Sequence, residues 1–191
     1  HADDFADRPL PYRVFLNKAY NDDGFEASYL LGSSEIGFGL FRGEDFPFGN
    51  VAANEGEGSE AWSVYYKSNF NMSNTEEIAF NLYYLSGKSP EFNERVSTED
   101  NVTFEGSSDL SVVSIDYANS YGNDSKFKIS AEYFYRNQDG TFEDAEESTG
   151  KVGFDDNDSG YYIALVNQFN DHLSTGFRYS EMLAADTPTG L

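Results

Sequence analysis

The feature that most constrains this chain is a repeated alternation of apolar and polar residues in short, aromatic-rich runs. A two-residue period is typical of β-strands, because successive side chains point to opposite faces of a sheet. Eight such runs predict eight strands. They cover residues 25–31, 35–41, 62–70, 77–85, 110–118, 127–136, 161–169 and 173–181.

The joints between these runs alternate in length along the chain. Tight joints at residues 32–34, 71–76, 119–126 and 170–172 link the runs into pairs, and long polar joints at 42–61, 86–109 and 137–160 separate the pairs. Transmembrane β-barrels have short turns at one end and longer loops at the other. Each run is also about nine residues long, enough for a tilted strand to cross the hydrocarbon layer. We therefore expect an all-β, antiparallel, up-and-down transmembrane barrel with about eight strands in this segment.

Sorting each run by alternate residues gives an apolar face and a polar face. If the apolar faces meet lipid, the charged residues of the polar faces line the interior. The predicted pore-lining residues are Glu26, Lys67, Asp116, Lys128, Glu132, Arg136 and Arg178. The residues predicted to form aromatic girdles at the membrane interfaces are Tyr29, Trp62, Tyr66, Tyr84, Tyr117, Tyr135 and Tyr179.

The 191 residues are expected to form one barrel domain or barrel segment. Residues 1–23 are predicted to be a loop on the extracellular side, 24–183 to contain the strands and their loops, and 184–191 to begin the next loop. The chain begins at His1 in a polar stretch and ends without a terminal aromatic strand, so we expect it to be a piece of a longer chain.

The net charge of the chain limits which classes of molecule it can bind. The net charge is −22, with 34 acidic residues against 12 basic ones, which argues against nucleic acid as a partner. Most of the acidic residues fall before the first run or in the long joints. Such a crown would attract cations at the mouth of a barrel. The acidic joints also fit a protein that is soluble in a saline habitat, or one bridged by divalent ions to surface lipid, and we favour these less specific explanations.

No arrangement of residues predicts catalysis, a metal site or a cofactor. The chain has no cysteine and only two histidines, His1 and His172, so a multi-histidine zinc site cannot form from this segment alone. The stretch from Asp155 to Gly160 resembles the start of a calcium loop, but Val166 occupies the position where an EF-hand requires glutamate. We predict a protein that is not an enzyme.

Several motifs resemble one family, in the same order along the chain. They are DFADRPLPYRVFL at residues 4–16 with NDDG at 21–24, FRGEDFP at 41–47, AEYFYRNQDG at 131–140, GYY at 160–162, QF at 168–169 and GFRY at 176–179. This set is similar to porin-like outer-membrane β-barrels of proteobacteria, some of them labelled zinc-regulated or TonB-dependent-receptor-like. The resemblance implies a larger barrel with further strands on both sides. It identifies no substrate.

The expected function is that of a porin-like channel or uptake barrel in the bacterial outer membrane. Its partners would be membrane lipid, lipopolysaccharide and small solutes, cations among them. Mean hydropathy is −0.59 and no stretch approaches the roughly 18 apolar residues of a spanning helix, so the sequence argues against a helical membrane protein. It does not argue against a barrel, whose strands face lipid with every second residue only. The alternative is a soluble, secreted β-sandwich acting as an adhesion or carbohydrate-binding module, because sandwiches also alternate polar and apolar residues.

Overall fold

A computed structural model describes residues 5, 7–16, 19–43, 47–48, 61–93, 102–121, 124–144 and 150–183. In this part of the chain one short helix precedes eight strands. The elements are α1 (Leu10–Leu16), β1 (Gly24–Leu31), β2 (Ser34–Phe41), β3 (Ala61–Asn71), β4 (Glu76–Asn93), β5 (Val102–Ser120), β6 (Lys126–Asp144), β7 (Val152–Asn170) and β8 (Leu173–Leu183).

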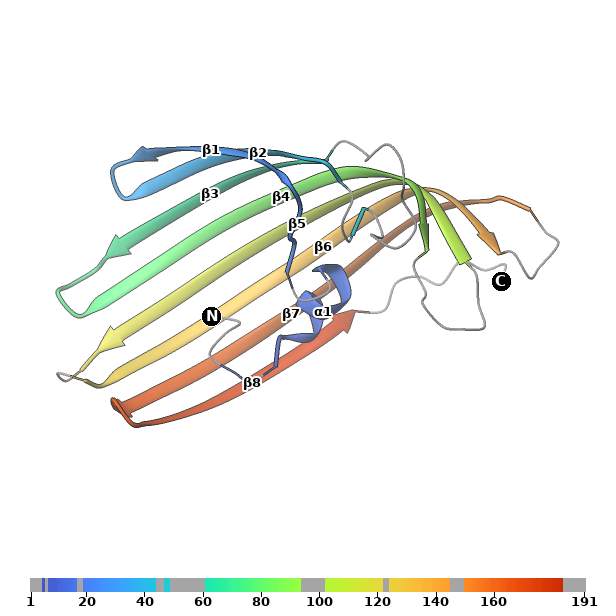
Figure 1. Cartoon of the computed structure of the whole chain (residues 1–191). Helices are drawn as coiled ribbons and strands as arrows, with labels where there is room; N and C mark the ends of the chain where they lie inside the picture. Colours follow the sequence, from blue (N-terminus) through green and yellow to red (C-terminus); the bar gives the residue numbers. More distant parts are fainter. Residues whose placement is uncertain are drawn as a thin grey trace.

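The eight strands form a single sheet in which each strand pairs antiparallel with the next one in sequence (Figure 1). The predicted all-β, up-and-down arrangement is confirmed, and each of the eight predicted runs lies in a strand. The strands that the structure describes do not close into a barrel: β1 and β8 are the two edges of an open, curved sheet.

The central strands are about twice as long as predicted. β4 has 18 residues and β5, β6 and β7 have 19 each. The predicted loops at 86–109 and 137–160 were therefore too long, since the structure leaves only 94–101 and 145–151 between strands. Polar and acidic composition suggested loops there, but backbone pairing continues regardless of side-chain polarity, as in the pair Asp139↔Asp155. The alternation of tight and longer joints survives this correction.

The strand register divides the sheet into two faces. We call the face that carries α1 the inner face and the opposite one the outer face. Large apolar side chains cover the outer face from β1 to β8 and are exposed there. They include Phe25, Tyr29, Leu31, Ile36, Phe38, Leu40, Trp62, Leu82, Val113, Ile115, Ile129, Tyr133, Tyr135, Ile163, Leu165, Phe177 and Tyr179.

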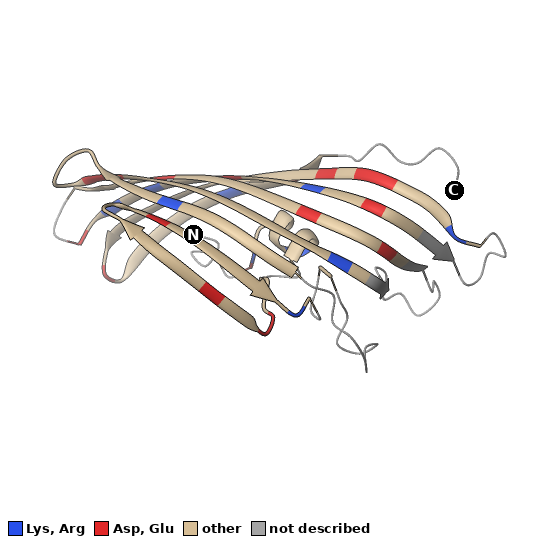
Figure 2. Cartoon of the chain, turned by 90° about the horizontal axis from the view of Figure 1, so that it is seen from above, with Lys and Arg blue, Asp and Glu red and all other residues tan. Residues whose placement is uncertain are grey.

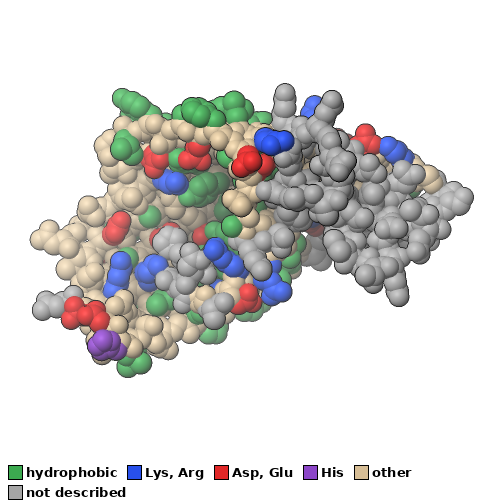
Figure 3. Space-filling model, in the orientation of Figure 1, with side chains coloured by type: hydrophobic (Ala, Val, Ile, Leu, Met, Phe, Trp, Pro, Cys, Tyr) green, Lys and Arg blue, Asp and Glu red, His purple; other side chains and the backbone are tan. Residues whose placement is uncertain are grey.

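The inner face combines charged side chains with a small apolar core. Lys, Arg, Asp and Glu occur along most strands in mixed order (Figure 2). Within the hollow of the sheet, acidic and basic side chains lie beside hydrophobic ones, and further hydrophobic side chains project at its outer rim (Figure 3). The core joins Phe15 of α1 and Phe48 to strand residues of the inner face. Those residues are Ala61, Leu85, Leu110, Val112, Phe134, Tyr162 and Ala164.

Helix α1 is short, and its stability comes from this core. It spans seven residues, with Pro11 in its first turn, where a missing backbone N–H costs nothing. Pro11 and Phe15 are its buried residues. Among the residues described, no helix is long and apolar enough to cross a membrane.

The hairpin tips advance steadily in one direction across the sheet. β3 runs three residues beyond Ser68, the partner of the first residue of β2. β5 runs one residue beyond Asn119, which faces the first residue of β4, and β7 runs two beyond Gln168, which faces the first residue of β6. A stagger of constant sign is the shear that strands need to tilt around a barrel axis.

Gly37 of β2 makes room for an aromatic ring on the inner face. A Cβ atom at Gly37 would lie 2.2 Å from Cζ of Tyr65, a residue that is 7% exposed. The Tyr65 hydroxyl lies 2.8 Å from Glu35 Oε1 and 3.1 Å from Glu26 Oε1, so its one proton is shared between the two carboxylates. Only glycine therefore allows the ring to lie flat over β2 and reach both carboxylates.

We predict that Gly37→Ala lowers the free energy of unfolding by about 1–3 kcal/mol, because the added methyl group displaces the Tyr65 ring. Gly153→Ala is the matched control, since a Cβ there meets nothing within 4 Å. Urea titration followed by far-ultraviolet circular dichroism measures both. Equal stability of the two variants would contradict this account of Gly37.

Candidate functional site on the inner face

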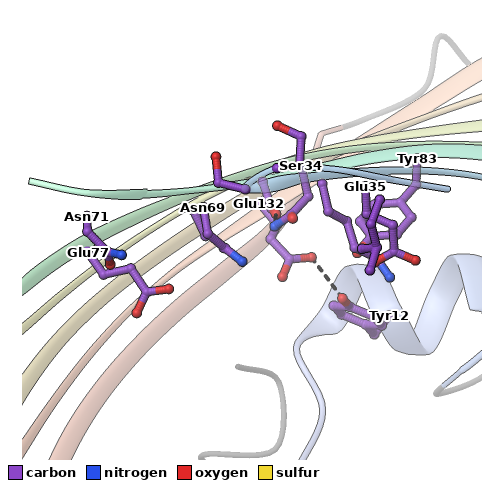
Figure 4. Close-up of a pocket in the computed structure, with 15 residues that line it drawn as sticks. Tyr12, Ser34, Glu35, Asn69, Asn71, Glu77, Tyr83 and Glu132 are labelled. Atoms are coloured by element: carbon purple, nitrogen blue, oxygen red, sulfur yellow. Dashed lines mark hydrogen bonds between the residues drawn. The ribbon is translucent and has the colours of Figure 1, made fainter.

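Glu132 of β6 holds α1 on the inner face. Its Oε2 accepts a hydrogen bond of 2.8 Å from the hydroxyl of Tyr12 (Figure 4). Its Oε1 accepts one of 2.6 Å from the hydroxyl of Tyr162 in β7. Glu132 is 7% exposed and Tyr162 is fully buried. Hydrogen bonds to a charged group are roughly twice as strong as those between neutral groups. Here the Glu132 carboxylate connects α1 to β6 and β7.

Aromatic contacts surround this hydrogen-bonded cluster. The ring of Phe134 lies 5.0 Å from that of Tyr12 in an edge-on arrangement and 6.1 Å from that of Phe15 in a stacked one. The guanidinium carbon of Arg136 lies 5.3 Å from the centre of the Phe15 ring. Helix α1 is thus fixed by packing on both sides of the Glu132 bonds.

Phe5 and the start of α1 lie close to glycines of β8 and β7. A Cβ at Gly160 would meet Met182 Sδ at 2.7 Å and Pro11 Cγ at 3.2 Å, and one at Gly176 would meet the Phe5 ring at 3.0 Å. The Arg178 guanidinium donates to the carbonyl oxygen of Asp7 and lies 4.9 Å from the Phe5 ring. Residues 1–23 were predicted to be a loop; their described part instead includes a helix that lies against the inner face. The predicted extracellular side of this segment stays a prediction.

Burial on the inner face raises the pKa of Tyr12, and the neighbouring Glu132 carboxylate raises it further. Both effects penalise the phenolate. The Tyr12 hydroxyl therefore keeps its proton and remains the donor in its bond to Glu132.

A cavity of about 690 Å³ opens beside α1, toward the tips of the hairpins. Tyr12 and Glu132 border it on one side, and the hairpins β1–β2 and β3–β4 on the other. The lining is mostly polar: Ser33, Ser34, Glu35, Lys67, Asn69, Asn71, Glu77, Asn81, Ser114 and the ring of Tyr83 take part. In Figure 4 the side chains of Asn69, Glu77 and Glu132 extend from the sheet to the side on which α1 lies.

All seven predicted pore-lining residues lie on the inner face, as the strand register establishes. Asp116, Glu132 and Arg136 are buried there. Arg136 Nη2 forms an ion pair of 2.6 Å with Asp158 Oδ2 on β7. Asp158 falls within the joint predicted at residues 137–160, but in the structure it lies in β7. That the seven residues line a pore stays a prediction.

Lys67 and Glu26 belong to a second cluster, around Tyr65. The ammonium of Lys67 lies 4.2 Å from the centre of the Tyr65 ring, within the range of a cation–π interaction. The register places Glu35 directly opposite Lys67. Asp116 and Lys128 are diagonal neighbours across β5 and β6.

The seven predicted girdle residues all lie on the outer face. Trp62 and Tyr179 lie toward the long-joint ends of β3 and β8, and Tyr29 and Tyr117 toward the hairpin tips of β1 and β5. Tyr66, Tyr84 and Tyr135 lie near the middle of their strands. Tyr161 lies beside Tyr179 on this face: its hydroxyl and that of Tyr179 donate to Glu181 Oε2 at 2.8 and 2.9 Å. Sequence analysis missed Tyr161 because its strand is apolar on both sides at its centre.

Sequence analysis also missed Tyr12, Tyr65, Tyr83 and Tyr162. Alternation cannot distinguish a tyrosine that faces a buried carboxylate from one that faces an apolar environment. For Tyr12, Pro11 just inside a short apolar segment was an available helix signal.

No group of three or more His, Asp or Glu side chains in the described part of the chain is arranged to hold a metal ion. His1 lies outside the described residues, and His172 lies in the exposed turn between β7 and β8. No protein-family model, curated protein or solved structure matches the chain significantly, so the family resemblance stays a prediction.

We predict that Tyr12→Phe destabilises the protein by about 1.5–3 kcal/mol, because Glu132 loses one of its two hydroxyl donors in a buried setting. Tyr135→Phe is the control, since its hydroxyl lies on the outer face and bonds to no described residue. Urea titration measures both. A Tyr12→Phe variant as stable as Tyr135→Phe would show that the Glu132 bond does not anchor α1.

The raised pKa of Tyr12 also predicts a pH dependence. In the unfolded chain a tyrosine loses its proton near pH 10, whereas the folded chain retains it. Folding stability is therefore intact below about pH 10 and falls as the pH rises above it. In Tyr12→Phe this fall should be shallower between about pH 9 and 11, as measured by urea midpoints; parallel curves would rule the contribution out.

Proposed function

We propose that this sheet is part of the wall of a porin-like barrel in the bacterial outer membrane, and that its polar inner face lines a passage for small solutes. The observation that carries the proposal is the exposed apolar outer face. On it, Phe25 is 68% exposed, Ile115 52% and Phe177 63%, which covers the sheet from its first strand to its last.

An apolar surface of this extent has few explanations. Monomeric soluble proteins rarely expose contiguous apolar patches larger than a few hundred Å². Lipid tails would cover such a face without any further protein. The inner face can meanwhile stay hydrated, which is the arrangement of faces in outer-membrane barrels.

The polar limits of the apolar outer face support the same placement. On β6 it runs from Phe127 to Tyr135 and is followed by Asn137. These nine residues fall within the range of about 9–11 that a tilted strand needs to cross the hydrocarbon core. Tyrosine and tryptophan at the ends of the band are suited to the headgroup level.

The hollow of the sheet supports a barrel of more than eight strands. An eight-stranded barrel has an interior just wide enough for its own side chains. Here α1 and Phe48 occupy the inner face in addition to the strand residues. The remaining strands would pair with the open edges at β1 and β8, and α1 would narrow the passage at the level of Glu132.

The alternative is a soluble β-sandwich. It would need a second sheet against the apolar outer face, and the described residues form one sheet only. The outer face is also exposed over its whole width, so a sandwich is less well supported.

A charge placed at the middle of the outer face tests the proposal. We predict that Ile115→Arg costs about 2–4 kcal/mol of folding free energy in lipid, because arginine faces the bilayer core. Asn157→Arg is the control, since Asn157 is exposed on the same face beyond the apolar band. Urea-induced unfolding from vesicles measures both. In a soluble protein an arginine at either exposed site would be tolerated, so equal effects would refute membrane placement.

Two further properties should accompany membrane placement. The complete protein should resist extraction from membranes by alkaline carbonate, and it should migrate differently on a denaturing gel before and after heating. A protein that stays monodisperse without detergent would contradict the proposal.

A further inference from the structure

The cavity beside α1 is bordered by a set of side chains that we call the polar ladder: Lys67, Asn69 and Asn71 on β3, and Asn81 and Glu77 on β4. The register places Lys67 opposite Asn81 and Asn71 opposite Glu77, all on the inner face. The ladder therefore extends from the level of Glu132 to the hairpin tip.

The ladder offers hydrogen-bond donors and acceptors side by side. Each asparagine amide carries both in fixed geometry. Asn81 donates to Ser114 Oγ at 2.8 Å. The exposed amides of Asn69 and Asn71 bond through their side chains to no other residue of the described chain, so they are available to a ligand in the cavity.

Tyr83 adds an aromatic surface to this polar lining. It is 39% exposed, on the same face as the ladder, and its ring lies 6.0 Å from that of Tyr65. A solute with C–H groups on its face can pack on the exposed Tyr83 ring. Hydroxyl groups on the edge of the same solute can form hydrogen bonds with the neighbouring amides and carboxylates.

The charges of the lining argue against ions as the ligand. Lys67 lies within the cavity wall, which disfavours a metal ion, while Glu77 and Glu132 disfavour an anion. The volume of about 690 Å³ is within the usual range for small-molecule sites. We propose that this cavity binds a neutral polyhydroxylated solute of mono- or disaccharide size. This inference rests on the proposed function, since the solute would be one that the barrel admits.

Calorimetric titration of maltose into the complete protein in detergent micelles tests the site. We expect saturable binding to the unmodified protein. The double variant Asn69→Ala/Asn71→Ala should bind about tenfold more weakly or worse, because it loses two amide hydrogen-bonding groups. Both residues are exposed, so the fold should be unaffected. Asn157→Ala removes an exposed amide from the outer face and should leave binding unchanged.

Tyr83→Leu should also weaken maltose binding, because it removes the ring but keeps an apolar side chain. Absence of maltose binding, or equal binding by the double variant and Asn157→Ala, overturns the proposed site. Saturable binding of calcium chloride in place of maltose overturns it too. Carbonate extraction of the same preparations separates the two proposals: a protein that inserts but binds no maltose refutes only the ligand, whereas one that binds maltose but does not insert refutes only the membrane placement.

Discussion

The structure depends on the strand register, which sends alternate side chains to two different environments. A shift of one residue in any pair would exchange the apolar set with the charged set. The pair Ser114↔Glu132, for example, places both residues on the inner face, while the next pair, Ile115↔Ala131, faces outward. Because all eight strands keep this agreement, the large apolar side chains of the central band share the outer face from β1 to β8.

The inner face is specialised along its length. Near the centre of β6 and β7, α1 is held by aromatic packing and by a single carboxylate with two tyrosine donors. Toward the hairpin tips the same face becomes exposed and rich in asparagine. A closely packed region that carries α1 therefore borders an open polar region, and Glu132 lies at the boundary between them. The glycines beneath Phe5 and Pro11 allow the helix-bearing segment to lie close to the strands.

The alternation of apolar and polar residues predicted the strand number and the face of every charged residue assigned to the interior, and the joint lengths predicted the antiparallel order. The prediction was wrong in two places, both of which were predicted to be loops. Polar composition was taken to mean a loop, although residues such as Asp139 and Asp155 continue the ladder in β6 and β7. The segment before the first strand was taken to be a loop, although Tyr12 and Phe15 find partners on strands more than 100 residues away. The alternation of neighbouring residues carries no information on contacts between residues so far apart in the sequence. The Glu132 cluster therefore could not be predicted from it.

Trp62 has a practical consequence. It is the chain's only tryptophan, it lies at one end of the apolar outer face, and its ring is 5.2 Å from that of Tyr84 and 6.4 Å from that of Phe38. Indole emission depends on the polarity of the medium around the ring. The fluorescence of Trp62 therefore reports on the polarity at the edge of the apolar outer face. A change of the medium around this edge can be followed without attaching a dye.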